Sequence, residues 1–126
     1  MDETVAGVQV RTWRDDPRRQ RKYHRPAVKR LLELLQRAPA GQRFFVVSDS
    51  DEIAPWLAGE VGPTRVIQFP RRTRRHQSWQ STAGMIEDLI DMWLLARTRH
   101  LYASYLSTFS EAAWWIGGAQ ADVDVF

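Results

Sequence analysis

Hydroxyl side chains gather where the sequence turns from an apolar strand, 101–104, into an apolar helix. Ser107, Thr108 and Ser110 lie at this turn, and Thr108 with Glu111 has the spacing of a capping box. A helix start presents unpaired backbone N–H groups, which together with hydroxyls bind phosphates and other anions. The stretch therefore predicts either an ordinary helix cap or an anion site.

Arginine dominates the basic residues, since 16 of the 18 are Arg. Arg binds carboxylates and phosphates bidentately, which favours an anionic ligand, although an Arg-rich genome with a solvated surface would give the same bias. The run Arg71 to His76 followed by Trp79 fits a diphosphate clamp, a solvated loop or a nucleic-acid patch. The net charge of only +3 favours the first two, and nucleic acid is not an expected partner.

Length and composition predict one domain, 1–126, with a single core. The absence of cysteine excludes disulfides and thiolate chemistry. No apolar run approaches the roughly 18 residues of a membrane span, and the N-terminus lacks the apolar core of a signal peptide, so we expect a cytoplasmic protein with no membrane partner. G-x-G-x-x-G, P-loop and G-x-S-x-G motifs are missing, and His24, His76 and His100 are too scattered to indicate a metal.

Alternating strands and helices must position these groups. Strands are predicted at 8–13, 43–47, 64–69, 101–104 and 123–126, after a lead-in at 1–7 and with a charged loop at 14–22. Helices are predicted from 26 to the Pro39–Gly41 stop, at 50–60, from 81 or 82 to about 99, and from the hydroxyl-rich turn to Gly117. The long helix that precedes the fourth strand is expected to bury an apolar stripe made of Ile86, Leu89, Ile90, Trp93 and Leu94.

This alternation predicts an α/β fold: a three-layer, doubly wound parallel sheet of about five strands, Rossmann-like, in the order 3-2-1-4-5. Strands one and four are then neighbours at the topological switch point, where such folds bind ligands. The loops that meet there are 11–14 and 104–110. The topology thus brings Arg11 against the hydroxyl-rich helix start and favours the anion site.

Carboxylates near this edge have two interpretations each. Asp91 falls on the border of the apolar stripe, where it could accept the paired N–H donors of a guanine base or lie solvated on the helix flank, whereas Asp88 points away. Asp49 and Asp51 end the second strand at the same edge. Asp49 with Glu52 also matches an N-cap and N3 pair, so helix capping is the alternative there.

Four short stretches resemble the donor-binding half of the GT-B fucosyltransferases, the superfamily of the bacterial nodulation α-1,6-fucosyltransferases and the protein O-fucosyltransferases. The resemblance covers roughly residues 8–118. In chain order the stretches are Val8-Gln9-Val10-Arg11-Thr12-Trp13, Phe44-Phe45-Val46-Val47-Ser48-Asp49-Ser50, Ile90-Asp91-Met92-Trp93-Leu94-Leu95, and Ser104 with Ser107-Thr108-Phe109-Ser110.

The resemblance implies a Rossmann-like domain that binds GDP-fucose without a metal or another cofactor, for inverting transfer to a hydroxyl of a glycan or protein acceptor. In the family an Arg after the first strand contacts the donor phosphates and is needed for transfer, and here it corresponds to Arg11. The Asp of the helix before the fourth strand contacts guanine, which implies the same for Asp91. A Ser/Thr-Phe-Ser turn holds the phosphates, matching Thr108, Phe109 and Ser110, with Ser107 beside them.

The sequence also departs from the family pattern. Gln9 stands where the family often has His, and the second basic residue is displaced to Arg14. GT-B enzymes close two halves around the reaction, and we expect the acceptor half to be missing here, so that the chain alone binds donor better than it transfers sugar. A further N-terminal domain or partner chain would supply that half.

Several site residues and functions stay open on the sequence. Asp49 and Asp15 are candidates for the general base. Two other functions are considered: a non-enzymatic flavodoxin-like module that binds a nucleotide or a partner protein, and a small nucleic-acid-binding domain that uses Arg71 to Arg75. The further candidate site residues are Arg14, Asp49, Arg74, His76 and Ser104.

Overall fold

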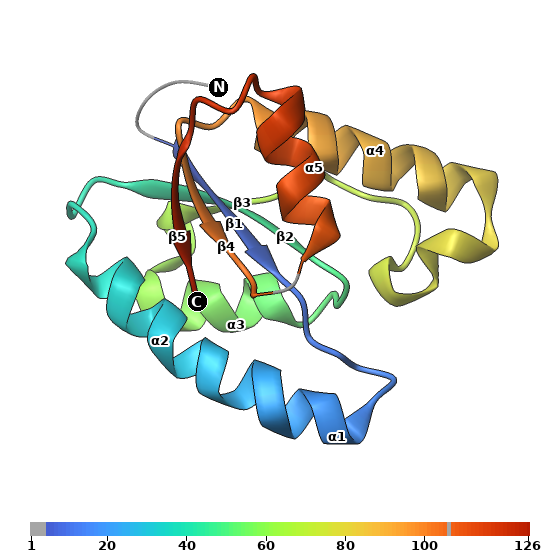
Figure 1. Ribbon diagram of the computed structural model, residues 1–126, viewed down its shortest axis with the longest axis horizontal. Helices are drawn as coiled ribbons and strands as arrows, with labels where there is room; N and C mark the ends of the chain where they lie inside the picture. Colours follow the sequence, from blue (N-terminus) through green and yellow to red (C-terminus); the bar gives the residue numbers. More distant parts are fainter. Residues whose placement is uncertain (1–4, 106) are drawn as a thin grey trace.

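A five-stranded sheet with helices on both faces forms the molecule, seen in a computed structural model that describes residues 5–105 and 107–126 (Figure 1). The strands are β1 (Val5–Val10), β2 (Arg43–Ser48), β3 (Val66–Ile67), β4 (His100–Ala103) and β5 (Asp122–Val125). The α-helices are α1 (Pro17–Arg19), α2 (Arg25–Arg37), α3 (Ile53–Val61), α4 (Thr82–Ala96) and α5 (Thr108–Ile116). A π-helix, η1 (Gln20–His24), and two 3-10 helices, η2 (Pro63–Arg65) and η3 (Arg75–Gln80), complete the list.

The sheet is parallel throughout and has the order β3-β2-β1-β4-β5, which confirms the predicted topology. Val8 on the central strand β1 pairs with Val46 on one side and Tyr102 on the other. The carboxyl ends of β1 and β4 are therefore neighbours, and the switch point lies where the sequence predicts it.

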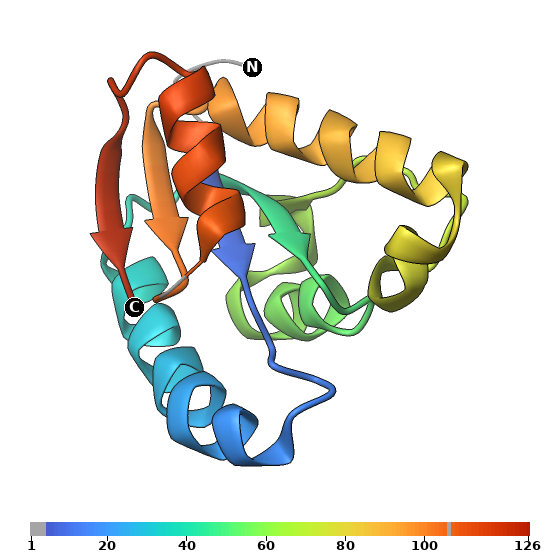
Figure 2. The same cartoon turned by 45° about the vertical axis from the view of Figure 1, so that its right-hand side comes forward.

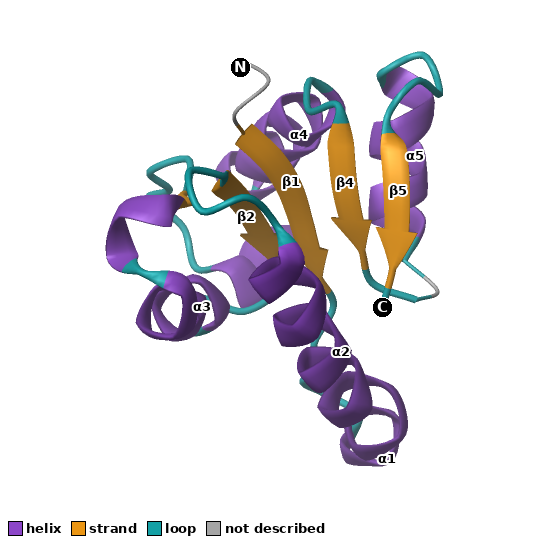
Figure 3. Ribbon diagram, turned by 90° about the vertical axis from the view of Figure 1, so that its left-hand side faces the viewer, coloured by secondary structure: helices purple, strands orange, loops and turns teal. Residues whose placement is uncertain are grey.

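Both faces of the sheet are covered, which is why β2 is apolar from Phe44 to Val47. Phe44 and Val46 belong to the core under α2 and α3, whereas Phe45 and Val47 belong to the core under α4 and α5. Figures 2 and 3 show the two helical layers on opposite sides of the strands. The helices contribute Leu31 and Leu35 of α2, Leu57 of α3, Leu95 of α4 and Ala113 of α5 to these cores.

The segment after β1 differs from the prediction. β1 already begins at Val5 within the expected lead-in, of which residues 1–4 lie outside the described part, and β1 ends at Val10 rather than at residue 13. The predicted charged loop is wrong, because a helix starts at Pro17 and continues through η1 into α2. Asp16 caps it by accepting a hydrogen bond from the N–H of Arg19 at 3.1 Å, and Pro17 supplies a preset φ at the first position.

Two element boundaries around β2 and β3 were also misplaced by the sequence patterns. The helix expected from residue 50 begins at Ile53, and neither Asp49 nor Glu52 caps it. Asp49 instead accepts a hydrogen bond from the N–H of Thr12 at 3.0 Å and so ties the end of β2 to the loop after β1. The strand expected at 64–69 is reduced to Val66–Ile67, because Pro63 starts a 3-10 turn.

Leu94 packs against the core as predicted, but most of the predicted core stripe of α4 is wrong. Ile86, Leu89 and Trp93 are 53%, 51% and 55% exposed, whereas Asp91 and Leu95 on the opposite side are buried. The helix also ends at Ala96 rather than near Arg99. Periodicity failed here because α4 buries a paired carboxylate on its inner face, and a hydropathy pattern assigns carboxylates to solvent.

None of the helices in the described ranges combines the length and the hydropathy that a membrane span requires.

Candidate functional site

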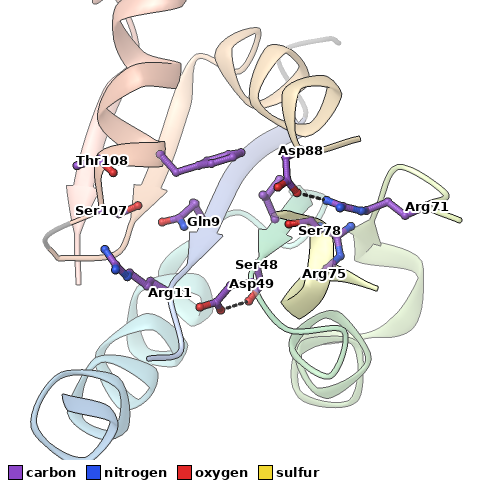
Figure 4. A pocket seen from close by; sticks show the side chains of 12 residues that line it. Gln9, Arg11, Ser48, Asp49, Arg71, Arg75, Ser78, Asp88, Ser107 and Thr108 are labelled. Carbon is purple, nitrogen blue, oxygen red and sulfur yellow. Dashed lines mark hydrogen bonds and ion pairs between the residues drawn. The ribbon is translucent and has the colours of Figure 1, made fainter. Parts of the chain in front are cut away.

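A pocket of about 300 Å³ opens at the carboxyl ends of β1 and β2, beside the start of α5. Figure 4 shows Arg11, Ser107 and Thr108 on one side of it and Arg71, Arg75 and Asp88 on the other, with Gln9 between them. Ser48, Asp49, Ser78, Val47 and Phe109 complete the lining. Cationic side chains thus stand on both sides of one pocket at the switch point.

Backbone and side-chain bonds join the ends of β1 and β4 directly under this pocket. The N–H of Arg11 donates to Oγ of Ser104 at 2.8 Å, and that hydroxyl donates to the carbonyl of Gln9 at 2.9 Å. Ser104 is buried and therefore acts as a brace between the strands rather than as a lining residue. The predicted meeting of the two loops is confirmed.

The guanidinium group of Arg11 stacks on an indole ring. Its central carbon lies 3.8 Å from the ring centroid of Trp13, and the corresponding carbon of Arg19 lies 5.1 Å from the same centroid. Trp13 has a φ of 55°, in the left-handed region that non-glycine residues rarely adopt and that costs about 1–3 kcal/mol. The turn thus places a strained aromatic residue against the arginine that follows β1.

The start of α5 is capped one residue earlier than the sequence indicates. Oγ of Ser107 accepts a hydrogen bond from the N–H of Ser110 at 3.3 Å, so Ser107 is the N-cap and the predicted capping box of Thr108 and Glu111 is wrong. Thr108 is the first helical residue and faces the pocket with Phe109. The preceding Leu106, part of the predicted turn, lies outside the described residues.

Ser110 does not reach the pocket with the other hydroxyls. Its Oγ is buried and donates to Oε1 of Gln9 at 2.7 Å. Gln9 therefore braces β1 against α5 while it also lines the pocket.

The opposite wall is an ion-pair cluster, made of Arg71, Arg75, Asp88 and Asp91. Nη1 of Arg71 lies 2.7 Å from Asp88 Oδ1 and 2.9 Å from Asp91 Oδ2, and Nη1 of Arg75 lies 2.7 Å from the same Asp91 Oδ2. The two Arg side chains are only 5% and 3% exposed. Burial opposes the charge of Arg71, but its bonds to Asp88 and Asp91 prevail and raise its pKa.

Asp91 lies behind the pocket and not in it. It is fully buried rather than on a stripe border or a solvated flank, and both guanidinium groups use its Oδ2. Its Oδ1 has no hydrogen-bond partner among the described residues. Asp88, which the sequence directs away from the site, is the carboxylate of α4 that lines the pocket.

The basic segment before α4 is fastened to that helix by Glu87. Its carboxylate accepts hydrogen bonds from the N–H of Arg72 at 2.8 Å and from the N–H and Oγ1 of Thr73 at 2.9 and 2.6 Å. The Thr73 hydroxyl, followed by the Arg72 N–H, lowers the pKa of Glu87. The segment that carries Arg71 and Arg75 is thereby held against α4.

A second cavity of about 390 Å³ adjoins the pocket and receives other predicted site residues. Arg14, Asp15 and His76 line this cavity, and Asp49 lines both spaces. Arg74 is exposed and lines neither. Sequence reasoning singled out the basic run but named Arg74 and His76 within it, whereas Arg71, Arg75 and Ser78 are the members that reach the pocket.

His24 has a shifted pKa, which makes the stability of the fold depend on pH. Burial lowers its pKa from 6.5, while the charge of Asp49 and a hydrogen bond to the backbone of Arg11 act in the opposite direction. Below pH 6.5 the unfolded chain then binds more protons than the folded chain, so the free energy of unfolding falls as the pH decreases. We expect His24→Gln to reduce this loss, measured as urea midpoints at about pH 7.5 and 5.5, whereas an identical pH dependence in both proteins would contradict it.

Similar proteins are found among solved structures. No protein-family model matches the chain, and no curated protein does. Solved structures do match. NodZ α-1,6-fucosyltransferase co-crystallized with GDP is 21% identical with a TM-score of 0.53, fucosyltransferase NodZ from Bradyrhizobium is 22% identical with 0.53, and NodZ α-1,6-fucosyltransferase soaked with GDP-fucose is 24% identical with 0.50.

Each match covers 86% of this chain but only 34% of the other, so the chain spans about a third of the length of these enzymes. At such identities the matches concern the fold. The chain therefore has a Rossmann-like fold similar to one part of the NodZ α-1,6-fucosyltransferase structures.

Proposed function

We propose that this chain binds a nucleoside diphosphate sugar, GDP-fucose by its resemblance, in the pocket between Arg11 and Arg75. One observation carries the proposal: three guanidinium groups and a helix start line one pocket at the switch point of a doubly wound sheet. A diphosphate carries negative charge on adjacent groups and suits a pocket with cations on both walls. The similar NodZ structures that were co-crystallized with GDP or soaked with GDP-fucose support the same ligand class.

In the proposed reaction an acceptor hydroxyl attacks the anomeric carbon of the sugar, the glycosidic bond to the diphosphate breaks, and the configuration inverts. GDP leaves with the bonding electron pair. Arg11 and the first N–H groups of α5 would stabilise this developing charge, an effect worth about 3–4 kcal/mol per well-placed donor. The scheme requires no metal.

A base must take the proton of the attacking hydroxyl. Asp49 is our candidate because it lines both the pocket and the adjoining cavity, and its Oδ1 is fixed by the N–H of Thr12 at 3.0 Å. Asp15 lines only the adjoining cavity. Since GT-B enzymes use two domains, we propose that this chain supplies donor binding and that transfer to a glycan or protein acceptor needs a second domain or partner chain.

A nucleic-acid surface built on the basic run is less well supported. Phosphate backbones are bound by accessible Lys and Arg side chains. Arg71 and Arg75, half of the four arginines in the run, are instead buried in pairs with α4. A non-enzymatic nucleotide-binding module would use the same pocket and differs from our proposal only in the absence of transfer.

Calorimetric titration of the chain with GDP, GDP-fucose, UDP and ADP tests the proposal. We expect the guanine nucleotides to bind more tightly than UDP and ADP. Failure of GDP to bind, or equal affinity for all four, would refute a GDP-sugar site. Addition of a glycan acceptor and GDP-fucose, with detection of released GDP, distinguishes an enzyme from a binding module.

A further inference from the structure

We infer that Arg75 is a ligand of the bound diphosphate and that Asp91 is the positioning residue that holds it, instead of reading the nucleobase. The inference rests on the proposed function, because it concerns the same pocket. It differs from the role that the family resemblance implies for Asp91. Its basis is the ion-pair cluster on α4.

Arg75 is built into the wall between the two cavities. It lines both of them, although its side chain is only 3% exposed. Nη1 is bonded to Asp91 at 2.7 Å, and Nε lies 3.8 Å from Asp51. No described residue accepts a hydrogen bond from Nη2. A guanidinium group held at Nη1 and faced by a carboxylate at Nε keeps Nη2 for a charge-assisted hydrogen bond to an anion in the pocket.

The backbone of Arg75 is fixed as well. Its N–H lies 3.3 and 3.4 Å from the two carboxylate oxygens of Asp51, at the start of η3. The neighbouring Arg74 differs in every respect, since its side chain is exposed and no ion pair of the described residues includes it. Within one basic run the structure therefore provides a candidate ligand and its control.

Asp91 is poorly placed to contact a base directly. Its carboxylate is fully buried and does not line the pocket. Oδ2 already accepts from two guanidinium groups, and paired N–H donors of a guanine would need both oxygens. A buried carboxylate between two arginines instead fixes their orientation, and its loss leaves buried charges without a partner.

A thermodynamic cycle tests the inference. Calorimetry measures the affinities for GDP, UDP and inorganic pyrophosphate. The proteins compared are wild type, Asp91→Asn, Arg75→Gln, the double variant and the control Arg74→Gln. We expect Arg75→Gln to weaken all three ligands about 10- to 100-fold, and Arg74→Gln to change them less than about twofold. Asp91→Asn should weaken the affinity for all three ligands several-fold and to a similar extent. In a protein that already carries Arg75→Gln, it should cause no further loss of affinity.

The inference is overturned if Asp91→Asn weakens GDP while pyrophosphate affinity is unchanged, because Asp91 would then read the base. It is equally overturned if Arg75→Gln leaves pyrophosphate binding intact. Both of these outcomes leave the proposed function standing when wild type prefers GDP. Pyrophosphate binding that depends on Arg75 and Asp91, without any preference for GDP over UDP, would refute the GDP-sugar site and retain the inference.

Two further controls distinguish a loss of ligand binding from a loss of folding. Arg75→Lys keeps the charge without the fork and should restore part of the pyrophosphate affinity, which a role in stability alone does not predict. Thermal unfolding of each variant identifies any that does not fold. If Arg75→Gln does not fold, the affinities of Arg75→Lys are compared with those of wild type instead. If folded wild type binds none of the three ligands, both the inference and the proposed function are wrong.

Discussion

Arg11→Ala should weaken GDP binding by roughly 10- to 100-fold, a loss of affinity as large as the one expected for Arg75→Gln in the same pocket. A charge-assisted hydrogen bond to phosphate contributes about 1.5–3 kcal/mol, and removal of the guanidinium also takes away the nearer of the two cations over the ring of Trp13. The free energy of unfolding should change little, because the brace between Ser104 and residue 11 uses backbone N–H. Calorimetric titration with GDP measures the effect.

Arg14→Ala is the matched control for this experiment. Arg14 belongs to the same loop and lines the adjoining cavity, but it does not line the pocket. Its removal should change the GDP affinity less than about threefold, a difference typical of a solvent-screened charge. If the two variants lose affinity equally, general electrostatic attraction and not a built site accounts for binding.

Gly84→Ala should destabilise the fold and weaken GDP binding together. A Cβ atom at residue 84 would lie 2.3 Å from the carbonyl oxygen and 2.7 Å from Cα of Ser78, both backbone atoms. Since η3 cannot shift by a side-chain rotation, it must move away from α4 with Arg75 and Ser78. Overpacking of this kind costs about 1–3 kcal/mol, measured by urea unfolding, and the displaced Arg75 should reduce GDP affinity by about 10-fold or more.

Gly59→Ala provides the comparison, because Gly59 lies inside helix α3 and a Cβ there meets no atom within 4 Å. The same substitution should stabilise the protein there by about 0.5–1 kcal/mol through helix propensity and leave GDP affinity unchanged. If Gly84→Ala proves as stable and as tight-binding as Gly59→Ala, the contact between η3 and α4 does not position the site.

The sequence was sufficient for the sheet and for one wall of the site. Apolar strands alternating with helices allow few parallel arrangements, so the order of strands and the meeting of Arg11 with Ser107 and Thr108 followed from topology. These groups lie at strand ends or a helix start, where position in the sequence almost determines position in space.

The other wall depends on contacts that local patterns do not contain. Asp91 and Arg75 are 16 residues apart, and their pairing makes a charged residue part of the interior of α4. Hydropathy periodicity therefore assigned the wrong face of that helix to the core. The approach of η3 to Gly84 is likewise a tertiary contact, which a single glycine within a helix does not reveal.

The helix before α2 was missed for a different reason. Its charged residues are largely exposed and extend α2 away from the core, so no apolar period marks it. Only local signals remained, namely Asp16 at the N-cap and Pro17 at the first position, and both also fit a turn.

Amide chemical-shift mapping of the ¹⁵N-labelled chain during a GDP titration tests the location of the proposed site most directly. The account predicts that the largest shifts fall on Arg11 and Thr12, on Ser107 to Phe109, and on η3 near Arg75. Saturation without shifts at these positions would contradict it, and so would shifts confined to Trp114, Val123 and Val125, which line the apolar cavity between α5 and β5 but not the proposed site.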